Sequence, residues 1–78
     1  MREGKMKEKK VQDILAPFLE GTPLKPSVSL ADRLIHAVEL MVNHNRKYIA
    51  VVRKGRPIGV VYLKDAFQEL GIKGLTKG

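Results

Sequence analysis

The sequence of 78 residues predicts an α/β (α+β) fold, in which helices flank a small three-stranded mixed sheet. Apolar residues recur at helical spacing in three segments, and two other segments are continuous apolar runs typical of buried strands. The order along the chain is helix, short strand, helix, strand, strand, helix. The short strand, the helix after it and the next strand form a crossover that is expected to be right-handed. The last two strands are expected to form an antiparallel hairpin.

The chain before residue 30 predicts a short helix followed by a very short edge strand. One apolar stripe at helical spacing runs through residues 11–18 and consists of Val11, Ile14, Leu15 and Phe18. Pro17 lacks an N–H group and disfavours helix in the residue before it, so this helix is expected to be short or bent. Residues 24–26 are predicted to form the edge strand. Pro23 and Pro26 limit its length, and proline is found in edge strands because it has no N–H group to donate.

A capping box at Ser29 predicts the start of the second helix. The Ser29 hydroxyl is expected to accept a hydrogen bond from the N–H of residue 32, while the carboxylate of Asp32 reaches back. Apolar residues then recur at helical spacing, so we predict a helix over residues 30–43.

The second half of the chain predicts a hairpin and a final helix. Residues 48–52 and 58–62 are apolar runs joined by a short loop, residues 53–57, that contains a glycine. Both runs are nearly continuous rather than alternating, so little water is expected on either face of the strands. The last helix is predicted over residues 63–70, and Gly71 is a suitable left-handed stop.

We expect three parts along the chain: a basic flexible N-terminal arm (1–10), a single folded domain (11–71) and a C-terminal tail (72–78). A single domain of this size without cysteine cannot gain stability from disulfides, so self-association is expected. The helices can cover one face of the sheet, and nothing else in the chain is expected to cover the other. A two-fold homodimer that uses exposed sheet and helix faces is therefore predicted.

The composition excludes several classes of site. No cysteine is present, and the two histidines, His36 and His44, would lie about 12 Å apart along a helix, too far to share a metal ion. No glycine-rich phosphate loop and no catalytic constellation is found, so we expect neither an enzyme nor a bound metal. No apolar run is long enough to span a membrane, and a soluble cytoplasmic protein without a membrane partner is expected.

The net charge of +7 favours anionic partners without identifying them. One basic cluster lies within the folded part and contains no acidic residue: Arg46, Lys47, Arg53, Lys54 and Arg56. Binding of single-stranded nucleic acid also requires exposed aromatic side chains. Phe18 and Phe67 lie on apolar helical faces instead, so a nucleic-acid partner rests on charge alone and is the weakest of the functions considered.

The stretch from Gly59 to Asp65 joins a buried strand directly to a helix. Free N–H groups at a helix start suit an anionic or polyhydroxyl ligand. The Asp65 carboxylate could accept hydrogen bonds from two vicinal hydroxyls, as acidic residues do with ribose in other nucleotide-binding folds. The same carboxylate would also stabilise the helix dipole without any ligand, and spacing alone favours this second interpretation.

The chain from Val11 to Leu70 resembles a single motif of the cystathionine-β-synthase type, the CBS domain. Residues 11–15 (VQDIL) are similar to the opening V-x-D-I-M of the family, and Pro26 with Ser29-Leu30 is similar to P-x-x-S-L. The later pattern L-P-V-V…G…hhGhh(T/S)xxD resembles Ile49-Ala50-Val51-Val52, Gly55, Ile58-Gly59-Val60-Val61 and Asp65. The resemblance implies a regulatory module rather than an enzyme.

Motifs of this family work in pairs, as Bateman modules, and many bind AMP, ATP or related adenosine compounds between the two motifs. The resemblance implies that Asp65 holds the ribose hydroxyls and that Tyr62 occupies a Thr/Ser position near ribose or phosphate. The other expected ligand contacts are Leu24, Ile49 and Ala50 beside the adenine, and Arg46, Lys47 and Lys64 near phosphate.

Three positions depart from the family pattern. Tyr62 is bulkier than Thr or Ser and would fill the cleft or stack on a base. Ala50 replaces the usual proline, and Arg53 replaces a common acidic residue. A CBS domain that serves assembly without a small ligand is therefore the alternative to a nucleotide-binding homodimer.

Overall fold

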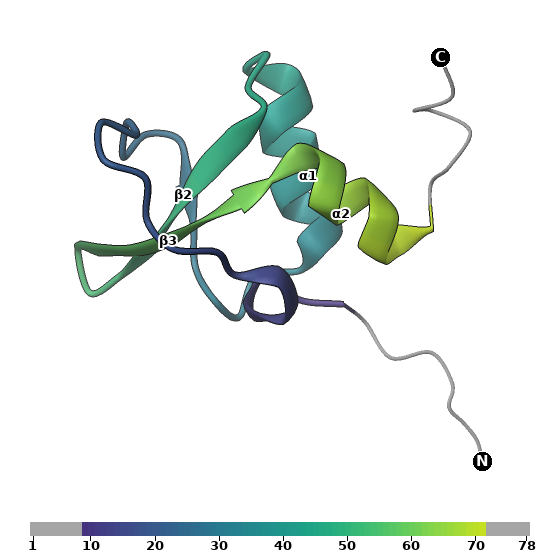
Figure 1. The fold of residues 1–78 in the computed structure, drawn as a ribbon, viewed down its shortest axis with the longest axis horizontal. Helices are drawn as coiled ribbons and strands as arrows, with labels where there is room; N and C mark the ends of the chain where they lie inside the picture. Colours follow the sequence, from purple (N-terminus) through teal and green to yellow (C-terminus); the bar gives the residue numbers. More distant parts are fainter. Residues whose placement is uncertain (1–8, 72–78) are drawn as a thin grey trace.

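The computed structural model describes residues 9–71, and Figure 1 shows how they fold. The predicted α+β class and the order of the elements are confirmed. The elements are η1 (Val11–Ile14), β1 (Ser27–Val28), α1 (Leu34–Asn43), β2 (Tyr48–Arg53), β3 (Arg56–Tyr62) and α2 (Leu63–Leu70). Most of the predicted arm and all of the predicted tail lie outside the described residues.

The sheet has three strands in the order β1-β2-β3, so β2 is central. β1 pairs with β2 in parallel, with Ser27 opposite Ala50, as a strand–helix–strand crossover requires. β2 and β3 form the predicted antiparallel hairpin, in which Tyr48 lies opposite Tyr62. The mixed sheet predicted from the sequence is therefore confirmed in both pairings.

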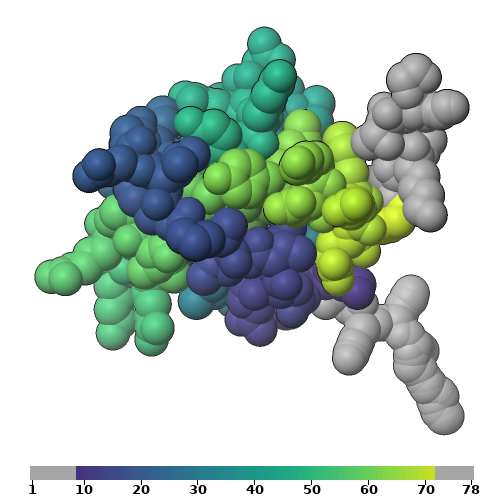
Figure 2. All heavy atoms as spheres, in the orientation of Figure 1, coloured from purple at the N-terminus to yellow at the C-terminus, as the bar shows by residue number. Residues whose placement is uncertain are grey.

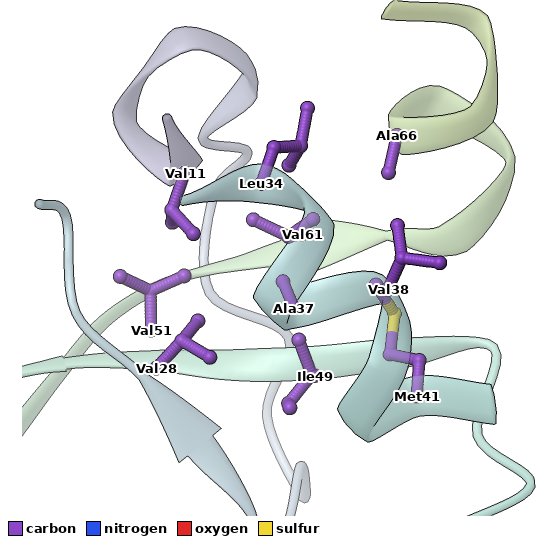
Figure 3. Close-up of a cluster of buried hydrophobic side chains, with 10 residues drawn as sticks. All are labelled: Val11, Val28, Leu34, Ala37, Val38, Met41, Ile49, Val51, Val61 and Ala66. Atoms are coloured by element: carbon purple, nitrogen blue, oxygen red, sulfur yellow. The ribbon is translucent and has the colours of Figure 1, made fainter. Parts of the chain in front are cut away.

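One face of the sheet packs against α1 and α2 to form the core (Figure 3). Side chains alternate along a strand, so Ile49 and Val51 of β2 point to this face together. They meet residues of α1 that recur at helical spacing. The buried cluster consists of Val11, Val28, Leu34, Ala37, Val38, Met41, Ile49, Val51, Val61 and Ala66.

The first predicted helix is shorter than expected. The apolar stripe predicted a helix over residues 11–18, but only the 3-10 turn η1 forms, and Leu15 is extended at φ −60° and ψ 131°. Pro17 accounts for the early end, because proline disfavours helical conformation in the residue before it. Ala16 pairs with β3 instead: its N–H donates to the Val60 carbonyl at 2.9 Å, and its carbonyl accepts from the Val60 N–H at 3.0 Å.

The short first strand lies later than predicted, at Ser27–Val28 rather than at residues 24–26. Pro26 explains the shift, because it has no N–H group to donate to a neighbouring strand. Pairing with β2 can therefore begin only after this proline.

The second helix begins at Leu34 rather than at residue 30. Half of the predicted capping box forms as a turn before the helix: the Asp32 carboxylate accepts from the Ser29 N–H at 2.9 Å. The N–H of Asp32 donates to the Ser29 carbonyl at 3.1 Å rather than to its hydroxyl. This turn does not continue into the helix, because the segment at Val11 pairs with it. The Val11 N–H donates to the Asp32 carbonyl at 3.0 Å.

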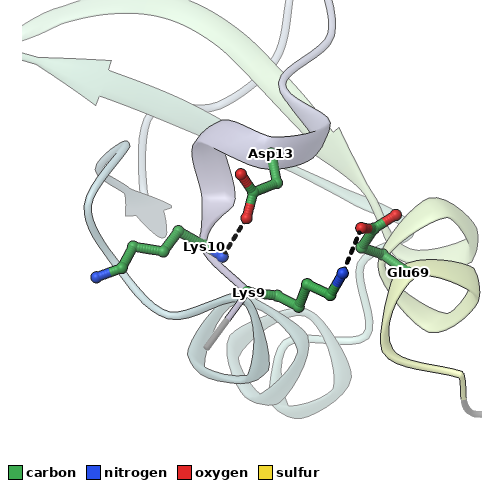
Figure 4. A network of polar contacts seen from close by, with 4 residues as sticks. All are labelled: Lys9, Lys10, Asp13 and Glu69. Atoms are coloured by element: carbon green, nitrogen blue, oxygen red, sulfur yellow. Dashed lines mark hydrogen bonds and ion pairs between the residues drawn. The ribbon is translucent and has the colours of Figure 1, made fainter. Parts of the chain in front are cut away.

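The two lysines before η1 are part of this folded region (Figure 4). Lys10 forms a bridge with Arg33, and its N–H donates to the Asp13 carboxylate at 2.8 Å. The ammonium of Lys9 lies 3.0 Å from a carboxylate oxygen of Glu69 on α2. Both partners of this ion pair are largely exposed, so it contributes little to stability.

The hairpin is longer than the sequence predicted. Strands extend into the expected loop of residues 53–57 and leave only Lys54 and Gly55 in the turn, both with positive φ (51° and 79°). Positive φ at both turn residues matches the twist of the flanking strands. The prediction for α2 over residues 63–70 is confirmed, and Gly71 ends it in the left-handed conformation at φ 76°.

The second face of the sheet is covered at its centre, contrary to expectation. Ala50 and Val60 lie opposite each other and point away from the helices, yet neither has any exposed surface. The segment that begins at Ala16 runs beside β3 and turns back towards β1, as the blue part of the chain in Figure 1 shows. The chain therefore keeps Ala50 and Val60 away from water without a second copy.

Gly59 permits the close approach of this segment to β3. A Cβ atom at this position would collide with the Ala16 carbonyl oxygen and would lie 2.6 Å from Cδ1 of Leu15. Backbone atoms cannot move aside as a flexible side chain can, so only glycine fits here.

We expect Gly59→Ala to lower the free energy of unfolding by about 1–3 kcal/mol, because the added methyl group overpacks this contact. Urea unfolding followed by circular dichroism measures the change. Gln68→Ala, a change to alanine at an exposed position of α2, is the control and should stay within about 0.5 kcal/mol of the wild type. Equal losses in the two variants would contradict a steric role for Gly59.

Candidate ligand-binding site

The strand–helix junction lies at the end of the sheet opposite the hairpin turn. Tyr48 begins β2 and Tyr62 ends β3, so the register places both at this end. α2 starts at the next residue, Leu63, whose N–H donates to the Lys47 carbonyl at 2.8 Å. This hydrogen bond ties the start of β2 to the start of α2 and fixes the geometry of the junction.

An aromatic pair covers this end of the sheet. The rings of Tyr48 and Tyr62 have centroids 5.8 Å apart and planes tilted by 48°, a favourable geometry for two aromatic rings. The sequence analysis assigned Tyr62 to the site and missed Tyr48. The pairing of residues 48 and 62 follows from the hairpin register, which the exact length of the turn decides, so the sequence pattern alone did not show it.

The carboxylate of Asp65 differs from the other two aspartates that begin turns. Those of Asp13 and Asp32 each accept a backbone N–H three residues earlier in the chain, at 2.8 Å and 2.9 Å. Asp65 lies at the third position of α2, half-buried, and caps nothing. Within residues 9–71 it makes no hydrogen bond or ion pair. The interpretation without a ligand therefore rests on the helix dipole alone, which favours the charge of Asp65 although its carboxylate caps no backbone N–H.

Three basic residues surround the junction. Arg46 and Lys47 lead into β2, and Lys64 follows Tyr62 in the first turn of α2. Lys47 and Lys64 are exposed, and Arg46 is half-buried. The Arg46 N–H donates to the Met41 carbonyl at 2.7 Å, which holds the loop close to the end of α1. Positive charge is thus concentrated at the end of the sheet where β2 and α2 begin and β3 ends.

The residues expected beside an adenine lie in three different environments. The side chain of Ile49 points into the core and is only 2% exposed. Ala50 lies on the opposite face, the face of Tyr48 and Tyr62, and is fully buried. Leu24 is 42% exposed; it precedes β1, which runs parallel to β2, so it lies towards the same end of the sheet. Of the three, Leu24 offers surface to a ligand.

Metal binding and membrane insertion each require a further structural feature. Among residues 9–71, no three His, Asp or Glu side chains are grouped closely enough to hold a metal ion. His44 is the C-cap of α1, and its ring nitrogen Nδ1 lies 3.1 Å from the Leu40 carbonyl oxygen. In the same part of the chain, the helices are too short or too polar to cross a membrane.

A family model for the CBS domain matches residues 22–72, which is more than half of the chain. The chain belongs to the CBS domain family. The match includes β1, α1, the hairpin and α2, and it begins after η1. The resemblance noted in the sequence is therefore confirmed for the part that carries the strand–helix junction.

A solved structure with a similar fold is that of a CBS domain-containing protein of unknown function from Kribbella flavida DSM 17836. The two chains are 23% identical and superpose with a TM-score of 0.50 over 70% of this chain. The match covers 37% of the Kribbella chain, so this CBS domain spans little more than a third of that protein. No curated protein matches the chain.

Proposed function

We propose that this CBS domain is a regulatory module whose two copies pair and bind an adenosine nucleotide of the AMP or ATP type. The observation that carries this proposal is the carboxylate of Asp65 at the start of α2, which has no hydrogen-bond or ion-pair partner within residues 9–71. A half-buried carboxylate without a hydrogen-bond donor gains most from a ligand that brings donors to it. The two hydroxyls of a ribose are such donors.

The surroundings of Asp65 supply the other groups that a nucleotide requires. The ring pair of Tyr48 and Tyr62 offers an aromatic surface on which a base can stack. Arg46, Lys47 and Lys64 bring positive charge for phosphate. These groups bind and orient a ligand, and none forms a nucleophile with an adjacent base, which suits a regulatory module rather than an enzyme.

Pairing of two copies is proposed through the outer side of α1. Ile35 and Val42 are 38% and 57% exposed, and their spacing of seven residues places them on one side of the helix. An apolar stripe of this spacing is typical of helices that pack against a partner helix. A two-fold axis would place the same stripe on both copies.

Asp65→Asn is expected to weaken nucleotide binding about tenfold or more, because hydrogen bonds to a charged group are worth roughly 1.5–3 kcal/mol. Calorimetric titration with AMP, ATP and S-adenosylmethionine measures the affinity. Glu20→Gln, an equal change at an exposed carboxylate outside α1 and α2, is the control and should bind as the wild type does. No heat with any of the three ligands, at protein concentrations well above micromolar, would refute the nucleotide proposal.

Val42→Lys is expected to convert a dimer into a monomer, because it places a charge in the apolar stripe of both copies. Light scattering at matched concentrations gives the mass of each variant. Asn43→Lys adds the same charge on the neighbouring, exposed position of α1 and should leave the dimer intact. A monomeric wild type would contradict the pairing.

The contact between Tyr48 and Tyr62 also supports a second candidate, a CBS domain that assembles without a small ligand because its rings fill the cleft. Tyr62→Thr separates the two. If the wild type binds nucleotide by stacking, this variant should bind about tenfold more weakly, since base stacking is worth roughly 1–3 kcal/mol. If the rings block the cleft, the wild type should not bind, and Tyr62→Thr should gain binding in the same titration.

A further inference from the structure

The hairpin turn forms a second concentration of positive charge, at the other end of β2. Arg53, Lys54 and Arg56 are exposed, and no acidic residue lies between residues 40 and 64. Figure 2 shows the hairpin, in green, projecting from the body of the molecule. Five residue steps along β2 separate Arg53 from Tyr48, about 17 Å, so this group is distinct from the strand–helix junction.

The three cations line a common recess. Arg53 and Arg56 are directly opposite each other in the hairpin register, so their side chains leave the same face. With Lys54 and the half-buried Ile58, they line an open recess of about 530 Å³. A β-bulge lies between Val51 and Val52, so the turn, rather than regular alternation from the core, sets how Arg53 and Arg56 are placed. The recess is therefore lined by three positively charged residues and one apolar residue.

This arrangement is unfavourable without an anion. Two like charges directly opposite on neighbouring strands destabilise the pair. Lys54 adopts a φ of 51°, at a turn position where Asn, Asp or Gly is usual. Within residues 9–71, none of the three cations has a hydrogen bond or ion pair through its side chain. An ion with several negative charges would offset the repulsion.

We propose that this recess binds the phosphate groups of a small linear oligophosphate. The guanidinium groups of Arg53 and Arg56 match phosphate oxygens in bidentate geometry, while Lys54 contributes a compact charge. Neighbouring phosphate groups can occupy the space between the two arginines and neutralise all three cations. A single carboxylate would leave part of this positive charge uncompensated. Ile58 adds one apolar side chain to the lining of the recess.

Phosphate groups of this kind could come from a free oligophosphate or from the backbone of a nucleic acid. Residues 53–58 contain no aromatic side chain, and both tyrosines are at the far end of the hairpin. Single-stranded nucleic acids depend on base stacking for much of their affinity. The hairpin offers no such surface, and this favours the free oligophosphate.

Titration of the full chain with inorganic tripolyphosphate in 50 mM salt tests the proposal. Arg53→Gln and Arg56→Gln should each weaken binding about tenfold or more. Lys25→Gln removes one equally exposed charge outside the hairpin and should change the affinity less than twofold. Without ligand, the two arginine variants should unfold at or above the wild-type temperature, because the opposed charges are gone. This check separates loss of a site from loss of the fold.

Three results would overturn the proposal. The first is no binding of tripolyphosphate by the wild type, and the second is equal weakening in all three variants, which indicates a general charge effect. The third comes from anisotropy with a fluorescent oligothymidylate. If the oligonucleotide binds far more tightly than tripolyphosphate and the arginine variants lose only that binding, the hairpin is a nucleic-acid contact. The recess and the strand–helix junction lie at opposite ends of β2, so loss of tripolyphosphate binding in the arginine variants tests the recess independently of the nucleotide proposal.

Discussion

Burial of β2 on both edges and both faces is the constraint on which the rest of the structure depends. β1 and β3 take its backbone hydrogen bonds, α1 and α2 cover Ile49 and Val51, and Ala50 is fully buried on the other side. The backbone polar groups of its buried residues, Ile49, Ala50 and Val51, must therefore find partners within the chain, because water does not reach them. The remaining elements are arranged to satisfy this one strand.

The central hairpin leaves two chemically different ends exposed. At one end, the strand–helix junction combines a carboxylate, two phenol rings and three cations, so hydroxyl donors, an aromatic base and negative charge would each find a complementary group there. At the other end, the turn carries cations alone, which suits a purely anionic group. The same strand pair thus separates two chemically different ends by its own length, and a change at one end need not disturb the other.

Local patterns were sufficient to predict much of the fold. The apolar runs and helical periodicities gave the correct order of elements, the parallel and antiparallel pairings, and the final helix with its glycine stop. Most of the errors in the element boundaries lie in the segment before α1, where Pro17 and Pro26 moved the boundaries of η1 and β1. There the conformation is decided by pairing with distant residues, such as Ala16 with Val60, which periodicity does not report.

For the site, the sequence by itself determined the residue types and their place at a strand–helix junction, together with the membership of the CBS domain family. Only the tertiary structure decided which side chains can contact a ligand. Ile49 is buried in the core, the ring of Tyr48 packs against that of Tyr62, and the carboxylate of Asp65 has no hydrogen bond or ion pair within residues 9–71. The physical reason is that a family pattern or an apolar run specifies local conformation. Strand register and burial, which decide what a side chain can contact, arise only when segments far apart in the chain come together.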